Sequence, residues 1–260
     1  MKNQWKTLLL LTTALGVVLL YALLFEEDIN IDVRIPRANV AKAFEPCSAD
    51  SLSDGAGLAA SRRDSLLARQ TPDSTHQQVL FFGDSMLEGL TRRLVDYTEA
   101  NGHDLHTVVW YSSSSKLWAE TDTLQHFIRK VKPSYIIVCL CGNELFVHDL
   151  DVRDRYIKTI LMKIGDIPYV WVGPPNWKPD TGINDVIIRN VGRGRFFDSR
   201  YLQLQRGKDH AHPTFTAAAQ WADTIARWLR SPNTLHPIRM DDPKEKAKHP
   251  DVTLLMPYRQ

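Results

Sequence analysis

Short apolar runs recur along the chain from residue 78 onward, with amphipathic or polar segments between them. Each run is rich in β-branched or aromatic residues, which is typical of strands that are buried on both faces of a sheet. The runs predict five strands, at residues 78–82, 106–111, 134–141, 168–174 and, more weakly, 194–199.

The segments between these runs have helical periodicity. They predict helices at Met86–Asn101, Trp118–Lys132, Val152–Ile164, Asn184–Asn190 and Phe215–Arg230. Strands that alternate with helices favour right-handed crossovers and a parallel sheet with helices on both faces. The sequence therefore predicts an α/β fold, a three-layer α/β/α architecture around a mostly parallel, roughly five-stranded central sheet. In such folds, ligands bind beyond the carboxyl ends of the strands.

A different pattern fills the first 28 residues. The run from Thr7 to Phe25 is uncharged, and as a helix it would span about 28 Å, close to the hydrocarbon thickness of a bilayer. Lys2 and Lys6 precede the run and acidic residues follow it, which predicts a cytoplasmic N-terminus and an extracytoplasmic remainder. The alternative is a cleaved signal peptide, but the run is longer than the usual ~7–15 residues, and its last part, "YALLF", lacks a small-x-small cleavage site.

These patterns divide the chain into four parts. Residues 1–28 are the predicted signal anchor, or transmembrane helix, of a single-pass membrane protein, whose remainder would be periplasmic in a Gram-negative cell. Residues 29–77 are rich in Ser, Asp, Ala and Gly and predict a stalk or linker. Residues 78–230 form the predicted α/β domain, and residues 231–260 are a predicted C-terminal tail.

Composition narrows the function classes. The 260 residues carry a net charge of +2, which gives no electrostatic reason to expect a nucleic-acid partner. The three cysteines, Cys47, Cys139 and Cys141, cannot all pair within one chain, so no disulfide framework is expected. Cys139 and Cys141 share one apolar run and are expected to be small core residues. Neither a metal site nor a cofactor is expected.

Polar residues follow the predicted strands, beginning with Gly83-Asp84-Ser85. One interpretation is helix capping, because Asp and Ser side chains accept hydrogen bonds from the first free N–H groups of a helix. The other is that Ser85 is a nucleophile, exposed at a strand-to-helix turn beside free backbone N–H groups. The choice depends on whether the chain supplies a base.

The segment "DHAHP", just before the last predicted helix, contains a candidate base. Asp209 and His212 are three residues apart, and a turn could direct both side chains to one side, so that Asp209 orients the imidazole toward a hydroxyl. The alternatives are that His212 is a surface histidine and that His210 takes its place. Asn143 follows the third predicted strand, where its amide would either donate to an oxyanion or form a turn.

In this order, the three segments resemble blocks of the SGNH (GDSL-type) hydrolase family, over about residues 78–230. "FFGDS" is similar to the first block, with Ser85 as nucleophile and Asp84 holding the turn. "CGNE" is similar to the third block, with Asn143 as an oxyanion donor. "DHAHP" is similar to the last block, with Asp209 and His212 completing a triad. The resemblance implies a flavodoxin-like SGNH hydrolase fold with a catalytic domain at residues 78–230.

The chain departs from the family pattern at two places. The second block of the family usually has a Gly whose backbone N–H donates to the oxyanion, but the matching loop here is "SSSS". Counting from the end of the strand indicates Ser115 as the donor, and counting back from Asn143 indicates Ser114. The third block usually contains Asn-Asp, whereas Glu144 follows Asn143 here, either to brace the loop or to face the substrate.

The resemblance implies a serine esterase that forms an acyl-enzyme on Ser85, with the Ser85 N–H as a further oxyanion donor. Together with the predicted anchor, it implies an envelope enzyme acting on O-acyl esters, expected to be O-acetyl esters, of an envelope or extracellular glycan. Two alternatives remain: an O-acetyltransferase component that works with a multispanning membrane acyltransferase, and a non-catalytic tethered scaffold. Aromatic residues near the strand ends either stack on sugar rings or pack beneath the loops; they are Trp110, Tyr111, Trp118, Trp171 and Trp177.

Overall fold

The computed structural model describes residues 12–13, 29–31, 33–35, 71–247 and 250–257. The chain divides into two units, Met1–Arg62 and Arg63–Gln260. The described part of the first unit consists of two helical residues, Thr12 and Thr13, and of the antiparallel strands β1 (Ile29–Ile31) and β2 (Val33–Ile35), which the sequence analysis did not predict.

The predicted anchor and most of the predicted stalk lie outside the described residues. Of the apolar run, only Thr12 and Thr13 are described, and of residues 36–77 only the last seven are. Among the residues that are described, no helix combines the length and the apolar character needed to cross a membrane. The topology predicted from the charges around the apolar run stays a prediction.

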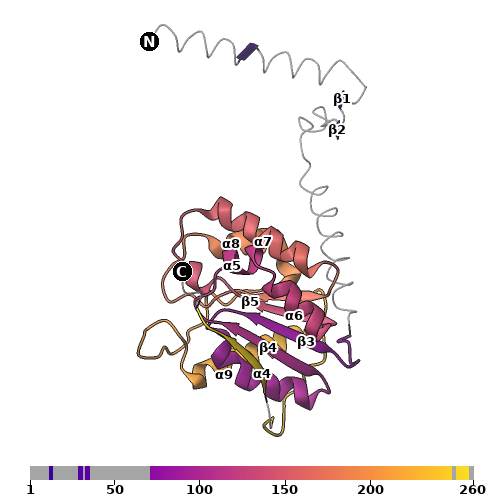
Figure 1. Cartoon of the computed structure of the whole chain (residues 1–260), viewed down its shortest axis with the longest axis vertical. Coiled ribbons are helices and arrows are strands. Elements are labelled where there is room, and N and C mark those ends of the chain that lie inside the picture. Colours follow the sequence, from indigo (N-terminus) through magenta and orange to yellow (C-terminus); the bar gives the residue numbers. More distant parts are fainter. Residues whose placement is uncertain (1–11, 14–28, 32, 36–70, 248–249, 258–260) are drawn as a thin grey trace, which may run out of the picture. The chain divides into compact units, whose positions relative to one another are not determined.

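A six-stranded parallel sheet forms the centre of the second unit (Figure 1). Its strand order is β7-β6-β5-β3-β4-β8, and every neighbouring pair is parallel. The strands are β3 (Gln78–Gly83), β4 (Asp104–Trp110), β5 (Tyr135–Cys139), β6 (Tyr169–Val172), β7 (Phe196–Phe197) and β8 (Asp251–Leu255). The predicted α/β fold is confirmed, with one strand more than expected.

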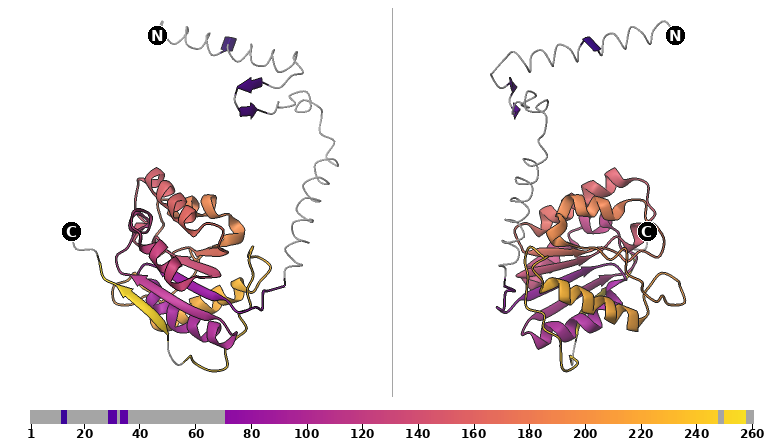
Figure 2. Two further views of the ribbon diagram at one scale, coloured as in Figure 1. Left: turned by 45° about the vertical axis from the view of Figure 1, so that its right-hand side comes forward. Right: turned by 180° about the vertical axis from the view of Figure 1, so that it is seen from behind.

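Helices cover both faces of this sheet (Figure 2). One face packs against α4 (Leu87–Ala100) and α9 (Phe215–Leu229), and the other against α5 (Ser115–Glu120), α6 (Thr123–Val131), α7 (Leu150–Ile164) and α8 (Ile183–Val191). Successive side chains of a strand point to opposite faces. Accordingly, Val79 and Phe81 belong to the first of these two cores and Leu80 and Phe82 to the second, all fully buried.

The helix predicted at Trp118–Lys132 is two helices. The chain is extended at Thr121, between α5 and α6. The ammonium group of Lys163 donates to the carbonyl oxygens of Trp118 and Thr121, at 3.1 and 2.7 Å. The prediction of one helix was wrong because a lysine from α7, distant in sequence, stabilises the break.

The predicted boundary at residue 230 is also wrong, because the C-terminal segment belongs to the fold. Ile238 and Met240 are buried in the core beneath α4 and α9. Strand β8 pairs with β4, and Nδ1 of His106 on β4 lies 2.5 Å from Oδ2 of Asp251 on β8. The sequence of β8 has only a short, partly polar run. A continuous apolar run is not needed there, because β8 lies at the edge of the sheet and is not covered on both faces.

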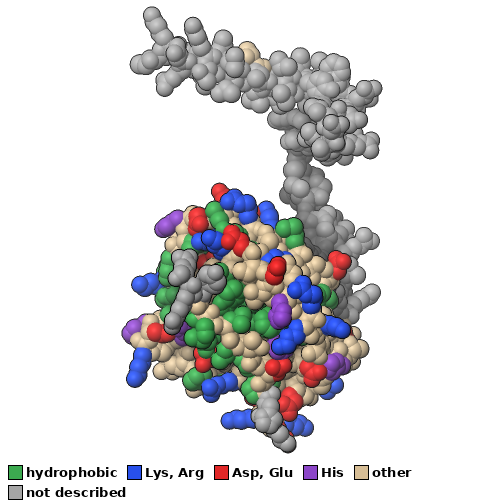
Figure 3. Space-filling model, viewed as in Figure 1, with side chains coloured by type: hydrophobic (Ala, Val, Ile, Leu, Met, Phe, Trp, Pro, Cys, Tyr) green, Lys and Arg blue, Asp and Glu red, His purple; other side chains and the backbone are tan. Residues whose placement is uncertain are grey.

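The surface mixes charges of both signs. On the face shown in Figure 3, Lys and Arg side chains are interspersed with Asp and Glu, and hydrophobic side chains are exposed among them. Among the described residues, the large hydrophobic side chains that are exposed are Phe146, Met162, Tyr201, Phe215, Val252, Leu254 and Met256.

Candidate active site

The loops that follow β3, β4 and β5 meet at the carboxyl edge of the sheet. They are neighbours because β3 pairs with β5 on one side and with β4 on the other. The loop after β3 contains Ser85, the loop after β4 contains Ser112–Ser115, and the loop after β5 contains the 3₁₀ turn Gly142–Glu144. The segment that precedes α9 brings His212 to the same place.

A hydroxyl, an imidazole and a carboxylate form a hydrogen-bonded line at this edge. Oγ of Ser85 lies 2.8 Å from Nε2 of His212, and Nδ1 of His212 lies 2.6 Å from Oδ2 of Asp209. The bond from His212 is the main reason why the pKa of Asp209 falls to about 2, so this carboxylate is ionised at neutral pH. An ionised Asp209 can only accept, which assigns the proton to Nδ1 and leaves Nε2 to accept from Ser85.

The turn that ends at His212 is held by hydrogen bonds of its own. The N–H of Gly207 donates to the carbonyl oxygen of His212 at 2.8 Å. Oδ1 of Asp209 accepts from the N–H groups of Ala211 and His212, both at 3.0 Å. The guanidinium group of Arg206 donates to the carbonyl oxygen of Ala211 at 2.8 Å. These bonds hold the turn, and with it the imidazole of His212, in place. Such bonds are needed because Ser85 and Asp209, which the imidazole contacts, also lie in loops.

Gly83 and Asp84 shape the turn after β3. A Cβ at Gly83 would lie 1.7 Å from the carbonyl oxygen of Cys139, so only glycine fits this close approach of two strands. Asp84 is 1 % exposed; its Oδ1 accepts from the N–H of Met86 at 3.0 Å and its Oδ2 from the N–H of Gly142 at 2.8 Å. Asp84 thus holds the turn, as predicted, and also ties it to the loop after β5.

In the loop after β4, Ser115 is not available as an oxyanion donor. It is fully buried, and both its N–H and its hydroxyl donate to the carboxylate of Glu144 at 2.7 Å. Ser113 is buried as well, and its Oγ accepts from the indole N–H of Trp118 at 3.0 Å. The prediction of a donor at Ser115 was wrong because a buried carboxylate from the neighbouring loop already uses that N–H.

The orientation of one peptide group also argues against Ser114. Nδ2 of Asn143 donates to the carbonyl oxygen of Ser113 at 2.9 Å. The peptide bond between Ser113 and Ser114 is trans, so the N–H of Ser114 points away from that carbonyl oxygen and from the Asn143 amide. The N–H of Ser114 and the amide of Asn143 therefore cannot hold the same oxyanion.

Ser112 is the residue of this loop that the sequence analysis missed. The N–H of Ser113 donates to the carbonyl oxygen of Trp110 at 3.1 Å, which closes a β-turn with Ser112 at its third position. Ser112 is exposed, has a left-handed φ of 57°, and its N–H has no hydrogen-bond partner within the described residues. Ser112 occupies a left-handed turn position of the kind that glycine usually fills, and the residue type itself does not indicate this.

The N–H groups at this edge that have no hydrogen-bond partner within the described part of the chain include three besides that of Ser114. They are the backbone N–H groups of Ser85 and Ser112 and the second hydrogen of the Asn143 amide. Each comes from a different one of the three adjacent loops. Donors with this origin can surround the oxygen of an ester carbonyl attacked by Ser85 and stabilise its negative charge.

The backbone of these loops is strained at corresponding places. Ser112, Cys141 and His210 have φ values of 57°, 82° and 59°, and each lies two positions before a predicted site residue. A left-handed conformation costs a non-glycine residue about 1–2 kcal/mol. Among the described residues, Lys132, which ends α6, is the other non-glycine residue with positive φ. Such strain is concentrated at functional sites, where position matters more than stability.

The predicted oxyanion role of Asn143 can be tested by its replacement with alanine, which is expected to lower kcat for ester hydrolysis by about 10²–10³-fold. Ser115→Ala is the matched control in the same network. It removes one hydrogen bond to Glu144 and is expected to cost less than about tenfold. Steady-state kinetics with p-nitrophenyl acetate would measure both. A larger loss in Ser115→Ala, with an unchanged circular dichroism spectrum, would mean that the hydroxyl itself takes part in the reaction.

The burial of Asp84 predicts a pH-dependent stability. Desolvation raises the pKa of Asp84 to about 6 despite its two N–H donors, and the negative charge of Glu144 adds to the shift. Because the folded protein binds this proton more tightly than the unfolded chain, Asp84 contributes less stability as pH rises from about 4 to about 6. At 1.36 kcal/mol per pKa unit, the change is about 3 kcal/mol.

Urea denaturation of the wild type and of Asp84→Asn between pH 4 and pH 7 would isolate this contribution. The stability of the wild type relative to the variant is expected to fall as pH rises. A difference that is constant over this range would contradict the raised pKa.

A small cavity of about 110 Å³ opens beside Ser85 and His212. It lies between the first turns of α4 and α9, and Met86, Gly89 and Phe215 contribute to its wall. Typical pockets for drug-sized ligands have about 300–1,000 Å³. The cavity has room for a small group next to the hydroxyl.

The aromatic residues near the strand ends divide into two sets. Trp110, Trp118 and Trp171 are at most 6 % exposed and pack beneath the loops, so they cannot contact a sugar ring. Trp177 is half-buried and meets Phe146 edge to face, with ring centroids 5.7 Å apart. Phe146, which follows Asn143 by three residues, is 45 % exposed. Tyr111 is half-buried as well, and its hydroxyl donates to Glu88 at 3.0 Å. Of the predicted aromatic residues, Tyr111 and Trp177 therefore stay partly accessible, and Phe146 joins them.

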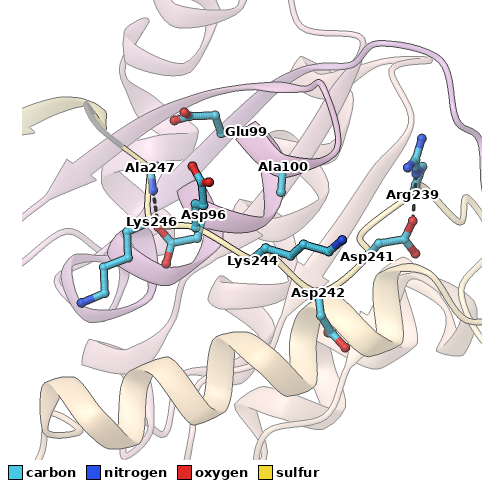
Figure 4. A pocket seen from close by; sticks show the side chains of 10 residues that line it. Asp96, Glu99, Ala100, Arg239, Asp241, Asp242, Lys244, Lys246 and Ala247 are labelled. Carbon is cyan, nitrogen blue, oxygen red and sulfur yellow. Dashed lines mark hydrogen bonds and ion pairs between the residues drawn. The ribbon is translucent and has the colours of Figure 1, made fainter.

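A larger hollow, of about 600 Å³, lies at the other end of α4 (Figure 4). Its walls are charged and partly paired, as in the bond of 2.9 Å from Arg239 to Asp241. The 14 residues of α4 place it about 20 Å from Ser85. It is separate from the Ser85 site. Within the part of the chain that the structure describes, no group of three His, Cys, Asp or Glu side chains could hold a metal ion.

No family model matches the chain, and no curated protein matches it at a significant level. Among solved structures, the chain is similar to a gut microbial diltiazem-metabolizing enzyme, with 11 % sequence identity and a TM-score of 0.46. The match covers 62 % of this chain and 48 % of that enzyme, so it spans about half of the enzyme's length.

Proposed function

We propose that residues 71–257 form a serine esterase of the SGNH type. The observation that carries the proposal is the line of contacts from Ser85 through His212 to Asp209, beside three free N–H donors. His212 takes the hydroxyl proton as Ser85 Oγ attacks the ester carbonyl, and then gives it to the leaving alcohol. Water, activated in the same way, hydrolyses the acyl-enzyme.

The N–H of Ser85, the N–H of Ser112 and the amide of Asn143 stabilise the tetrahedral oxyanion in this mechanism. Loss of one such donor typically costs about 2.7–4 kcal/mol of barrier. Asp209 stays ionised and keeps His212 in the tautomer that can accept a proton, and it stabilises the imidazolium ion that forms.

The size of the cavity beside Ser85 supports a short acyl group, and we propose O-acetyl esters as substrates. We further propose that the alcohol part is an envelope or extracellular glycan. The partly exposed pair of Phe146 and Trp177 supports this choice, because aromatic rings pack well against the apolar faces of sugars.

Acyl transfer is a second candidate function. The side chain of His212 is 43 % exposed, so the base is open to an acceptor from solution, and that acceptor can be a sugar hydroxyl as well as water. The domain would then act as an O-acetyltransferase component beside a multispanning membrane acyltransferase. The two candidates share every step up to the acyl-enzyme and differ only in the acceptor.

Incubation of the purified full chain in detergent with an acetylated glycan and a deacetylated acceptor glycan would separate these functions. Release of free acetate supports the esterase, and acetylation of the acceptor supports the transferase. Wild-type protein that produces neither, and whose Ser85 is never acylated, would favour the tethered scaffold.

The proposed location outside the cytoplasm predicts an accessible Ser85 domain. In spheroplasts, protease added to the outer face is expected to release a fragment containing Ser85, because lysines precede the apolar run at Thr7–Phe25 and acidic residues follow it. Immunoblotting would detect the fragment, with a cytoplasmic protein as the control for intact membranes. Protection of Ser85 together with that control would refute this topology.

A further inference from the structure

Glu144 is a buried carboxylate next to the proposed oxyanion hole. Its side chain is 2 % exposed, so it does not face the substrate. Its Oε2 accepts from the N–H of Ser115 and its Oε1 from the hydroxyl of Ser115, both at 2.7 Å. The guanidinium group of Arg153, from α7, lies 3.2 Å from Oε1.

Besides the bond from the Ser115 hydroxyl, two hydrogen bonds join the 3₁₀ turn Gly142–Glu144 to backbone groups of the loop after β4. Asn143 donates to the carbonyl oxygen of Ser113, and Glu144 accepts from the N–H of Ser115. Together they fix the backbone on both sides of Ser114. The β-turn that carries Ser112 ends at Ser113, whose carbonyl oxygen accepts the first of these two bonds.

Burying a carboxylate in order to hold a loop in place has a large desolvation cost. Its burial is tolerated only when its oxygens are hydrogen-bonded and its charge is paired, and an apolar side chain could fill the same space without these demands. An apolar residue, however, could not hold the N–H of Ser115. The bonds of Glu144 therefore indicate that the position of this backbone matters more than the stability of the core.

We propose that Glu144 is a positioning residue for the reaction: its carboxylate holds the loop after β4 so that the N–H of Ser112 faces the oxyanion. This inference rests on the proposed esterase function. Glu144 itself touches neither substrate nor reacting atoms, and it acts through Ser115 and the turn that precedes it. The oxyanion exists only along the reaction path. Loss of the Glu144 carboxylate should therefore lower kcat and leave KM nearly unchanged.

The decisive variant is Glu144→Gln, which keeps the shape of the side chain but places an N–H₂ group against one of the two Ser115 donors. Asp149→Asn is the matched control, because Asp149 also pairs with Arg153, at 3.3 Å, but is 49 % exposed and, among the described residues, has no hydrogen bond or ion pair to the loop after β4. The full chain in detergent is titrated with a fluorophosphonate, which counts reactive serines, and kcat is then expressed per reactive site.

For Glu144→Gln, we expect kcat per site to fall about 10–100-fold with KM changed less than about threefold. This is less than the loss of about 10²–10³-fold for removing a donor outright, because the donor is misplaced and not removed. The affinity of a boronic acid, which forms a tetrahedral adduct with the serine, should fall by the same factor. Asp149→Asn should stay within about twofold of the wild type. A role in folding alone would instead lower the number of reactive sites and leave kcat per site unchanged, which would overturn the proposal.

If Glu144→Gln does not fold, Glu144→Asp supplies the test, because a side chain shorter by one methylene keeps the charge but cannot reach both donors of Ser115. Its kcat per site is expected to fall at least about threefold, and boronic acid binding should weaken in parallel. A wild-type kcat per site in Glu144→Asp would overturn the proposal. Wild-type protein that fails to react with the fluorophosphonate would instead overturn the esterase function, and this inference with it.

Discussion

Alanine in place of Ser85 is expected to lower kcat for ester hydrolysis by about 10⁴–10⁶-fold, the largest effect in the molecule together with loss of His212. Ser85 supplies the hydroxyl that contacts Nε2 of His212, at 2.8 Å, so no acyl-enzyme can form without it. The N–H groups at the edge of the sheet remain in the variant and account for any residual rate. Hydrolysis of p-nitrophenyl acetate would measure the loss.

Ser231→Ala is a suitable control for this variant. Ser231 follows α9, and its hydroxyl donates to the carbonyl oxygen of Trp228, with no contact to the site. It should retain the wild-type rate. If Ser85→Ala retained it as well, with an unchanged circular dichroism spectrum, the domain would not be a serine hydrolase.

Alanine in place of His212 should cost as much as loss of Ser85, because the two side chains act as one unit. His210 provides the comparison within the same turn. It is exposed and left-handed, with a φ of 59°, so His210→Asn preserves the backbone that asparagine tolerates and should change kcat less than about threefold. Asp209→Asn should cost less than the loss of Ser85 or His212, at most about 10⁴-fold, because Asp209 orients and stabilises the imidazole but does not react.

Steady-state kinetics of the three variants would test this order. An inactive His210→Asn together with an active His212→Ala would mean that the other histidine is the base. Equal and complete loss in His210→Asn and His212→Ala, with normal spectra, would mean that the turn itself and not one imidazole is required.

The sequence predicted those parts of the molecule that local patterns determine. Buried parallel strands such as β3 and β5 have continuous apolar runs, and α4 and α9 have helical periodicity, so their existence and order followed directly. The pairing of Asp209 with His212 also followed, because a spacing of three residues within one turn brings two side chains together.

What the sequence could not predict depends on partners that are distant in the chain. Strand β8 is short and partly polar, and it is ordered by β4 rather than by its own propensity. The choice among the serines of the loop after β4 depended on Glu144, some thirty residues away, which removes the N–H of Ser115 from use. The left-handed turn at Ser112 gave no signal because serine rarely adopts that conformation.

Mass spectrometry of the acyl-enzyme tests the central claim most directly. Full-length protein is mixed with p-nitrophenyl acetate, quenched in acid within the first turnover, and digested. The account predicts one acetyl group per chain, on the peptide that contains Ser85, which disappears when the reaction is allowed to continue and is absent from Ser85→Ala. Acetylation of another residue as the transient species, or equal acetylation of Ser85→Ala, would contradict it.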